Sequence, residues 1–324
     1  MNNLKSLIVK PSISIIIPTL NEEKNIEKCL RSIFNQVYPK NRIEALIVDD
    51  DSIDRTVEIA RKYPVRILRN GHKHGEIGKM IGFRAAKGEY CMYLDADIEL
   101  RGKNWLKKIV KPLVENPNIT GSFTKYYSKV NTSPIERYLN FDPLQRDQIY
   151  QFFSPSIEDT IKSKIGEYYI CEYKIGNIPP AGLCLFRRKE LLDIVENFEM
   201  FLELDFLVLL VKNGFNKFVF VPEAGLYHHH VTSLFELLRK RKYNLTKVYF
   251  SHVKNNLYTW IDWKNPLHLS KLVLWIIYAN LFFPSLITGI YKSFKYRDWA
   301  GLYEPIVNLL VTDLLIISFL IHDK

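Results

Sequence analysis

The sequence predicts an α/β fold with a mostly parallel sheet flanked by helices, followed by apolar helices in the C-terminal third. The first third of the chain alternates short apolar runs with helix-length segments, the pattern of strands joined by right-handed crossovers. Beyond His268, long apolar stretches dominate instead. A chain of 324 residues, 47% of them hydrophobic, is also long enough to bury a full core.

The predicted strands and helices alternate along the chain. Residues 13–17 are almost all isoleucine, as expected for a buried parallel strand, and Pro18 ends the run. A helix is predicted from about 22 to 36, with Asn21 as its N-cap and one apolar face. Segment 126–175 shows only weak periodicity and receives no assignment. The other predicted strands are 45–48, 65–68, 90–94, 182–186 and 218–221, and the other helices are 54–62, 78–87, 189–196 and 203–212.

Two C-terminal segments are candidates for membrane helices. Segment 272–290 carries no formal charge and, at about 1.5 Å per residue, could almost cross a hydrocarbon layer of about 30 Å. Segment 306–321 is weaker, because Asp313 near a bilayer centre would cost at least ~2.5 kcal/mol unless it were paired. The basic loop between them conflicts with a simple hairpin under the positive-inside tendency. We expect transmembrane or re-entrant helices, with two buried helices of a soluble protein as the alternative.

The charge distribution favours a membrane or phosphate partner. The net charge of +10 is concentrated at 239–242 and 292–297, on either side of the most apolar part of the chain. No nucleic-acid-binding motif is recognisable, so no nucleic-acid partner is expected. The four cysteines are scattered without metal or disulfide spacing, and the N-terminus has too short an apolar run for a signal peptide. We therefore expect a membrane protein whose catalytic domain faces the cytoplasm.

The carboxyl ends of the predicted strands carry acidic residues. Ligands of open parallel sheets bind at this edge, which places the candidate site at 18–22, 49–54 and 95–97. Asp95 and Asp97 flank Ala96, and residues two apart in an extended segment project the same way. Two carboxylates suit Mg²⁺ or Mn²⁺ holding a diphosphate. Taken alone, such a pair is more often two solvated aspartates in a turn, and only its context favours a metal site.

Three motifs together resemble glycosyltransferase family 2 over about residues 13–242. The resemblance implies a GT-A, Rossmann-like fold and an inverting hexosyltransferase that uses Mg²⁺ or Mn²⁺ with a UDP-, GDP- or dTDP-sugar. The motifs are Ser14-Ile15-Ile16-Ile17-Pro18-Thr19-Leu20-Asn21-Glu22-Glu23, Val48-Asp49-Asp50-Asp51-Ser52-Ile53-Asp54 and Leu94-Asp95-Ala96-Asp97.

The resemblance also implies roles for donor-side residues. Asp50, next to Asp49, would accept a hydrogen bond from the base, and Asp95 with Ala96 would face the ribose or phosphate. Asp95 and Asp97 would bind the metal. Lys79 falls where relatives place an arginine, and Asp51 replaces a glycine, which is tolerable because Asp enters the left-handed region readily. The nucleoside pocket would be lined by Pro18, Thr19, Asn21 and Glu22.

Acceptor-side residues follow from the same resemblance. Residues 180–187 look like the acceptor-side strand, and 201–206 align with the acidic base motif. Relatives usually have Glu-Asp-x-Asp there, so Leu202 and Glu203 depart from the pattern. A hydroxyl acceptor needs a carboxylate to take its proton. Two residues at i and i+2 of a helix do not share a face, so one of Glu203 and Asp205 should point into the site, and we prefer Glu203.

The last motif residues lie near the predicted membrane segments. Tyr227-His228 resembles the strand end whose imidazole lies near the metal or diphosphate, while His229 and His230 are interpreted as surface neighbours and no structural zinc site is expected. Arg239, Arg241 and Lys242 lie on a predicted amphipathic helix, 231–249. These residues would contact either anionic lipid headgroups or a donor or acceptor phosphate.

Three functions remain open from the sequence. The preferred one is sugar transfer to a hydroxyl of a membrane-proximal, lipid-linked glycan. Direct transfer to polyprenyl (dolichyl) phosphate is the alternative, and a catalytically silent nucleotide-binding membrane scaffold is the third. The predicted domains are 1–230, with a nucleotide-sugar half to 125 and an acceptor half from 126, then interface helices at 231–265 and membrane-associated helices at 266–324.

Overall fold

The computed structural model describes residues 10–322 except 177, 179–182, 196, 251–256 and 258–260. By their contacts, the described residues form two compact units. The first unit contains those of 1–125, 160–176 and 181–228, and the second contains those of 126–159, 177–180 and 229–324.

A nine-stranded mixed sheet forms the centre of the first unit within the described residues, in the order β3-β2-β1-β4-β10-β6-β11-β9-β8. Strands β1 to β4 are parallel, and the register pairs Thr19 with Asp49, so β1 and β2 end at the same edge. A separate antiparallel pair joins β5 to β12. The strands are β1 Ile13–Thr19, β2 Ile43–Asp49, β3 Val65–Arg69, β4 Tyr90–Tyr93, β5 Ile98–Leu100, β6 Gly121–Phe123, β8 Ile161–Ile165, β9 Tyr168–Glu172, β10 Leu185–Arg187, β11 Lys217–Phe220 and β12 Leu226–His228.

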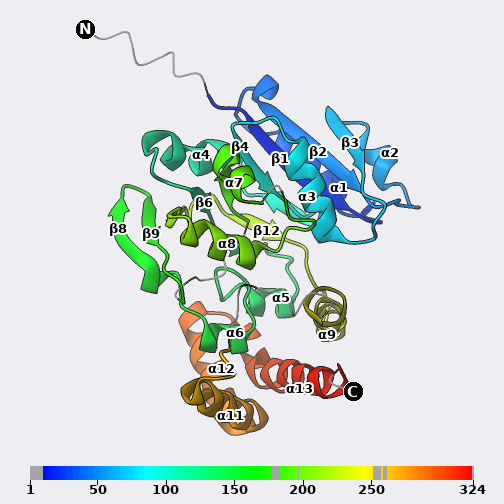
Figure 1. The fold of residues 1–324 in the computed structure, drawn as a ribbon. Coiled ribbons are helices and arrows are strands. Elements are labelled where there is room, and N and C mark those ends of the chain that lie inside the picture. Colours follow the sequence, from blue (N-terminus) through cyan, green and yellow to red (C-terminus); the bar gives the residue numbers. More distant parts are fainter. Residues whose placement is uncertain are drawn as a thin grey trace. The chain divides into compact units, whose positions relative to one another are not determined.

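Helices flank this sheet (Figure 1). The isoleucines of β1 are fully buried, which accounts for the run predicted as a central strand. Helix α3 lies so close to β1 that a Cβ atom on Gly82 would stand 2.1 Å from Cγ2 of Ile16. The helices of this unit are α1 Ile26–Phe34, α2 Thr56–Ala60, α3 Gly75–Ala85, α4 Trp105–Glu115, α7 Arg188–Val195 and α8 Glu203–Lys212, with a 3-10 turn at Lys40–Arg42.

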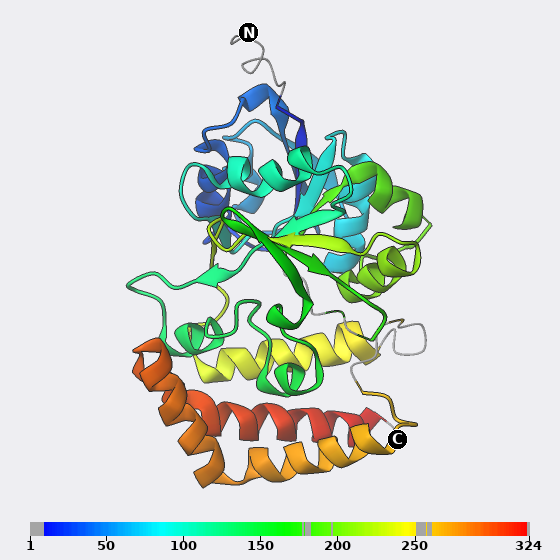
Figure 2. The ribbon, with the colours of Figure 1, turned by 90° about the vertical axis from the view of Figure 1, so that its left-hand side faces the viewer.

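The second unit is helical and has its own hydrophobic core. Its cluster of buried side chains combines Ile135, Tyr138 and Ile149, from the segment left unassigned in the sequence, with residues of the C-terminal helices. Helix α13 packs between α9 and α11 (Figure 2). The elements are β7 Tyr126–Tyr127, α5 Pro134–Leu139, α6 Gln148–Phe153, α9 Leu234–Tyr243, a π-helical segment Asn244–Tyr249, α11 Pro266–Asn280, α12 Phe282–Tyr296, a 3-10 turn Trp299–Tyr303 and α13 Glu304–His322, and a further 3-10 turn at Glu158–Thr160 spans the boundary between the units.

Ion pairs inside the second unit tie α5 and α6 to the C-terminal helices. Lys292 of α12 contacts Glu304 of α13 at 2.7 Å and Gln148 of α6 at 2.6 Å. Two further ion pairs are bidentate and partly buried. Arg137 of α5 pairs with Asp298, which follows α12, and Arg241 of α9 pairs with Asp147 at the start of α6.

The prediction of one continuous apolar helix over 272–290 is wrong, because the chain bends by 83° between α11 and α12. Pro284 accounts for the break. Proline has no backbone N–H to donate, and in a continuous helix its ring would clash with the carbonyl of Asn280. The segment 306–321, which the sequence predicted as the weaker membrane helix, belongs to the better candidate for crossing a membrane. By length and composition, Trp299–Ile321 is long and apolar enough, and the bent pair would be a second span if counted as one. Asp313 of α13 accepts a hydrogen bond from Asn280 of α11 at 3.4 Å.

Most predicted elements of the first unit are present with shifted ends. Helix α8 begins and ends as predicted, whereas α1 begins four residues later than expected, at Ile26. Asn21 is therefore not its N-cap. The predicted strand 182–186 and helix 189–196 each include a residue outside the described part, and the described elements there are β10 and α7.

Replacing Gly82 by alanine should destabilise the first unit. Alanine favours a helix over glycine by about 1 kcal/mol. The new methyl group would however overlap Ile16, whose own Cβ would stand only 3.0 Å from it, so a rotamer change cannot clear the overlap. We expect a net loss of about 1–3 kcal/mol in the free energy of unfolding, measured by urea denaturation. Gly75→Ala is the matched control in the same helix, since its Cβ meets nothing within 4 Å; equal effects of both substitutions would contradict the packing argument.

Candidate active site

The loops after β1 and β2 are joined by hydrogen bonds around Asp49. The Thr19 hydroxyl donates to Asp49 Oδ1 at 3.1 Å, and the Ser52 hydroxyl donates to the same oxygen at 2.6 Å. The Ser52 N–H donates to Oδ2 at 3.0 Å. Asp49 is 8% exposed, so its carboxylate holds the two loops in place rather than facing solvent.

Asn21, Glu22 and Asp50 lie at the same edge of the sheet. Asn21 has a φ of 55°, and its side-chain oxygen accepts from the N–H of Ile53 at 3.0 Å. The Glu22 N–H donates to Thr56 at 2.7 Å. Asp50 accepts the N–H of Lys73 at 2.8 Å through Oδ1. The structure thus brings the predicted nucleoside residues together at the ends of β1 and β2, while their contacts with a nucleotide stay a prediction.

Asp51 adopts the left-handed conformation expected where relatives have glycine, with a φ of 60°. Arg69 forms a bidentate pair with it, at 2.7 and 2.9 Å. This guanidinium, rather than a role in helix capping, accounts for the third acid of the 49–51 run and lowers the pKa of Asp51.

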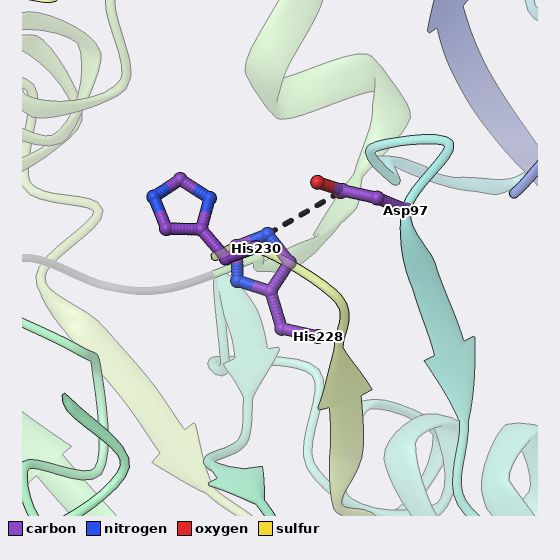
Figure 3. Close-up of side chains that lie close together, drawn as sticks. All are labelled: Asp97, His228 and His230. Carbon is purple, nitrogen blue, oxygen red and sulfur yellow. Dashed lines mark ion pairs between the residues drawn. The ribbon is translucent and has the colours of Figure 1, made fainter. Parts of the chain in front are cut away.

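The Asp95-Ala96-Asp97 segment is a turn between β4 and β5 rather than an extended strand end. Ala96 is buried. Strand β12 pairs with β5 so that His228 stands opposite Ile98, the residue after Asp97. This register places Nε2 of His228 3.3 Å from Oδ1 of Asp97, the ion pair dashed in Figure 3. His230, also drawn there, belongs to the second unit.

Asp97 and His228 are chemically suited to a divalent cation. Both side chains are largely buried, 14% and 10% exposed, and they present a carboxylate oxygen and an imidazole nitrogen. Mn²⁺ accepts both kinds of ligand, and Mg²⁺ prefers the oxygen. Asp95 precedes Asp97 by two residues in the same turn, and its role as a ligand stays a prediction.

Glu203, the first residue of α8, has a buried carboxylate. Tyr93 at the end of β4 donates its hydroxyl to Oε2 at 3.0 Å. The other oxygen, Oε1, is buried and has no hydrogen-bond partner among the described residues. Burial outweighs the nearby Lys79 and the Tyr93 hydrogen bond, and raises the pKa of Glu203 to about 8. Such a carboxyl exchanges a proton near neutral pH.

Lys79 lies beside this carboxyl. Its ammonium contacts Glu76 Oε1 at 2.9 Å and stands 4.1 Å from the centre of the Tyr93 ring. Burial alone would lower the pKa of Lys79, but Glu76 and Asp95 outweigh it and hold the pKa above its usual value. Lys79 therefore keeps its positive charge in a poorly hydrated position.

The remaining predicted residues lie elsewhere. Asp205 is buried in the first turn of α8, and which of Glu203 and Asp205 is the base stays a prediction. In the second unit, Arg241 is bound by Asp147 at 2.6 Å, so a phosphate would have to displace that carboxylate, whereas Arg239 is exposed. Residues 180–182 of the predicted acceptor strand lie outside the described part.

Sequence reasoning missed the residues that surround Glu203. Tyr93 was predicted only as a strand residue, although its place two residues before Asp95 puts it at the ligand edge. Glu76 gave no signal, since an acid in the first turn of a helix is common. Phe201 connects them, because its N–H donates to the Glu76 carbonyl and its ring packs on Tyr93 and Phe83.

Comparisons with known proteins identify the family that part of this chain resembles. Residues 14–168 match the profile of the family described as Glycosyl transferase family 2. A dolichol-phosphate mannosyltransferase of Pyrococcus furiosus is 34% identical over 133 residues, which are 39% of this chain and 37% of that protein. A dolichyl N-acetyl-alpha-D-glucosaminyl phosphate 3-beta-D-2,3-diacetamido-2,3-dideoxy-beta-D-glucuronosyltransferase of Methanococcus voltae is 56% identical over 91 residues, which are 26% of this chain and 28% of that protein. Such matches span less than half the length of the curated relatives.

Among solved structures, a mannosyltransferase from Pyrobaculum calidifontis, in complex with GDP-Man and Mn²⁺, has a TM-score of 0.55 at 15% identity. The likeness covers 96% of this chain and 88% of that one. It confirms the predicted GT-A-like α/β fold. Residues 14–168 therefore belong to glycosyl transferase family 2, whose model matches them.

Proposed function

We propose that this enzyme transfers a sugar from a nucleotide-diphospho-sugar to a hydroxyl group of a lipid-linked glycan, with inversion at the anomeric carbon. The observation that carries the choice of acceptor is the buried carboxyl of Glu203, with one oxygen unpartnered among the described residues. A hydroxyl must lose its proton as it attacks, whereas an ionised phosphate acceptor needs no base. A relative in Methanococcus voltae, named for transfer to a dolichyl-linked sugar, supports the same acceptor class.

In this proposal the ionised Glu203 takes the proton of the acceptor hydroxyl. The hydroxyl oxygen forms a bond to the anomeric carbon while the bond from that carbon to the diphosphate breaks, and the diphosphate leaves with the electron pair. Lys79 contributes a fixed positive charge beside the site, and Tyr93 holds the carboxylate in place. Asp205 is the alternative base.

Donor binding is proposed at the edge formed by Pro18, Thr19, Asp49 and Asp50. Asp97 and His228, with Asp95, would hold Mg²⁺ or Mn²⁺ there. A bound divalent cation would neutralise the charge that develops on the leaving diphosphate. The structural neighbour from Pyrobaculum calidifontis contains GDP-Man and Mn²⁺, which supports both ligands as classes.

We also propose that the second unit attaches the enzyme to a membrane. Support comes from the apolar helix Trp299–Ile321, of which only 39% of the most apolar stretch is buried, unlike the core helix of a soluble protein. Exposed apolar residues continue along α11 and α12, and include Val273, Phe283 and Ile287. The side of the membrane that the catalytic residues face stays a prediction.

The acceptor class can be tested directly. We expect purified enzyme with radiolabelled nucleotide sugars and Mn²⁺ to label a dolichyl-phosphate-linked N-acetylglucosamine in preference to plain dolichyl phosphate, because only the former offers a sugar hydroxyl. Thin-layer separation of the lipid products measures this. Efficient labelling of dolichyl phosphate would instead favour the alternative function, to which the relative in Pyrococcus furiosus points. Nucleotide binding without any transfer would leave the scaffold function.

Asp97→Asn should remove the effect of Mn²⁺ on nucleotide binding. The amide keeps the size of the side chain but loses the charge that binds the cation. Titration calorimetry with UDP and GDP, with and without Mn²⁺, measures the change. Asp51→Asn is the matched control: it removes one charge at the same sheet edge, from a residue paired with Arg69. Unchanged Mn²⁺ dependence in Asp97→Asn would rule out this metal site.

Glu203 should give turnover a characteristic pH dependence. The base acts only when ionised, so with a pKa of about 8, turnover should rise from pH 6 to 8 and level off above about pH 8.5. Glu203→Gln should lower turnover by about a hundredfold or more and flatten this rise, while nucleotide affinity stays unchanged. Asp205→Asn, measured in the same assay, is the comparison. Loss of turnover in Asp205→Asn with near-normal turnover in Glu203→Gln would assign the base to Asp205.

A further inference from the structure

The second unit contains an apolar pocket of about 210 Å³ between α11, α13 and the π-helical segment. Ile276 and Leu272 line it from α11, and Ile316, Phe319 and Leu320 line it from α13. Two lining residues, Thr312 and Tyr249, carry hydroxyl groups, and that of Thr312 already accepts a hydrogen bond from Trp275 at 3.0 Å. Water needs two to four polar partners in such a cavity, so the occupant that fits this lining is a hydrocarbon.

The pocket reaches the surface of the second unit. Leu320 and Trp263, which both line it, are 64% and 58% exposed. Helices α11 and α13, which line the pocket, also carry exposed apolar side chains, including Ile277 and Ile317. If the membrane covers these side chains, as proposed above, a hydrocarbon chain can enter the pocket from the lipid phase.

The size of the pocket fits a short length of chain. An apolar cavity of about 150 Å³ holds one benzene molecule, so about 210 Å³ accommodates roughly eight to ten carbon atoms, or about two isoprene units. Ordinary bilayer lipids gain little by entering, because lipid tails are as apolar as the lining. The occupant must therefore be selected by its shape and by its head group.

A basic surface leads to the pocket along one continuous helical segment. Arg239 and Lys242 are exposed on α9, and Tyr249, which lines the pocket, lies seven positions beyond Lys242. That separation would be about 10 Å in an α-helix, and it is shorter here because residues 244–249 are π-helical. An anionic phosphate near Lys242 and a hydrocarbon chain in the pocket could therefore belong to one molecule.

From these contacts we propose that the pocket binds the isoprenoid chain of the lipid-linked acceptor, with the lipid phosphate held by the basic surface of Arg239 and Lys242. This inference rests on the proposed function for its ligand. An isoprenoid chain is branched and unsaturated, so it loses less conformational entropy than a saturated acyl chain when it is fixed in a pocket. The catalytic residues then receive a lipid whose tail the second unit already holds, which raises its effective concentration.

The test uses the full chain in phosphatidylcholine nanodiscs and a photoreactive analogue of farnesyl phosphate, whose attachment sites are mapped by mass spectrometry. Ile276→Trp and Ile316→Trp should fill the pocket and lower labelling of α11 and α13 by about tenfold or more. The matched controls are Ile277→Trp and Ile317→Trp, the neighbouring isoleucines that are exposed and do not line the pocket. These should label as the unaltered protein does, and unlabelled farnesyl phosphate should compete better than dodecyl phosphate.

Two results would overturn the proposal. Equal labelling of all four variants would show that the chain binds elsewhere, and equal competition by dodecyl phosphate would make the pocket a general site for acyl chains. Labelling requires no donor and no sugar transfer, so it can be measured whether or not the protein transfers a sugar. A protein that labels as expected but transfers no sugar contradicts only that function, whereas full transfer to the lipid-linked acceptor by both filled variants contradicts only the pocket.

Discussion

The parallel alignment of β1, β2 and β4 is the constraint on which the candidate site depends. Its register pairs Thr19 with Asp49 and Ile16 with Tyr93, so the loops that follow these strands leave from one edge of the sheet. Fixed backbone spacing then places acids from distant parts of the sequence near one another. The β5–β12 pair adds His228 in the same way, by standing it opposite the residue after Asp97. Strand pairing therefore positions the residues at the strand ends, whereas Lys79 and Glu203 are positioned by helices α3 and α8.

Burial has opposite outcomes for the two charged groups beside Tyr93. For Lys79, the attraction of Glu76 and Asp95 exceeds the cost of leaving water, so the ammonium stays charged. For Glu203, desolvation exceeds the attraction of Lys79, so the carboxyl holds its proton to higher pH. One polar cluster thus combines a permanent cation with an acid that titrates near neutrality. Groups whose proton affinities differ in this way can divide charge stabilisation and proton transfer between them.

The sequence was informative where local pattern and burial agree. The isoleucines of β1 and the helix at 203–212 were predictable, because nearly every residue of β1 is buried and the helix buries most of its apolar side chains. The segment 126–159 was not predictable from its own pattern. Its buried residues Ile135 and Ile149 belong to a core shared with helices about a hundred residues later, and the segment itself shows only weak periodicity. The break between α11 and α12 could have been found from Pro284, which hydropathy alone does not register. The partners of Glu203 required the fold, because Glu76, Tyr93 and Phe201 meet only in three dimensions.

The composition of the second unit bears on how the catalytic part can be separated from the membrane part. Helices α5 and α6 lie between strands of the first unit in sequence, yet their core partners and ion-pair partners are α9, α12 and α13. A cut before α11 would leave Tyr138 without Glu304 and the buried Ile135 without its apolar neighbours, exposing apolar surface instead of isolating a domain. The predicted boundary at residue 230 divides the chain into consecutive domains, whereas each compact unit combines several separate segments of the chain. The first unit is therefore discontinuous in sequence, and loss of a C-terminal partner such as Glu304 or Asp298 would act on the 126–159 segment that interrupts it.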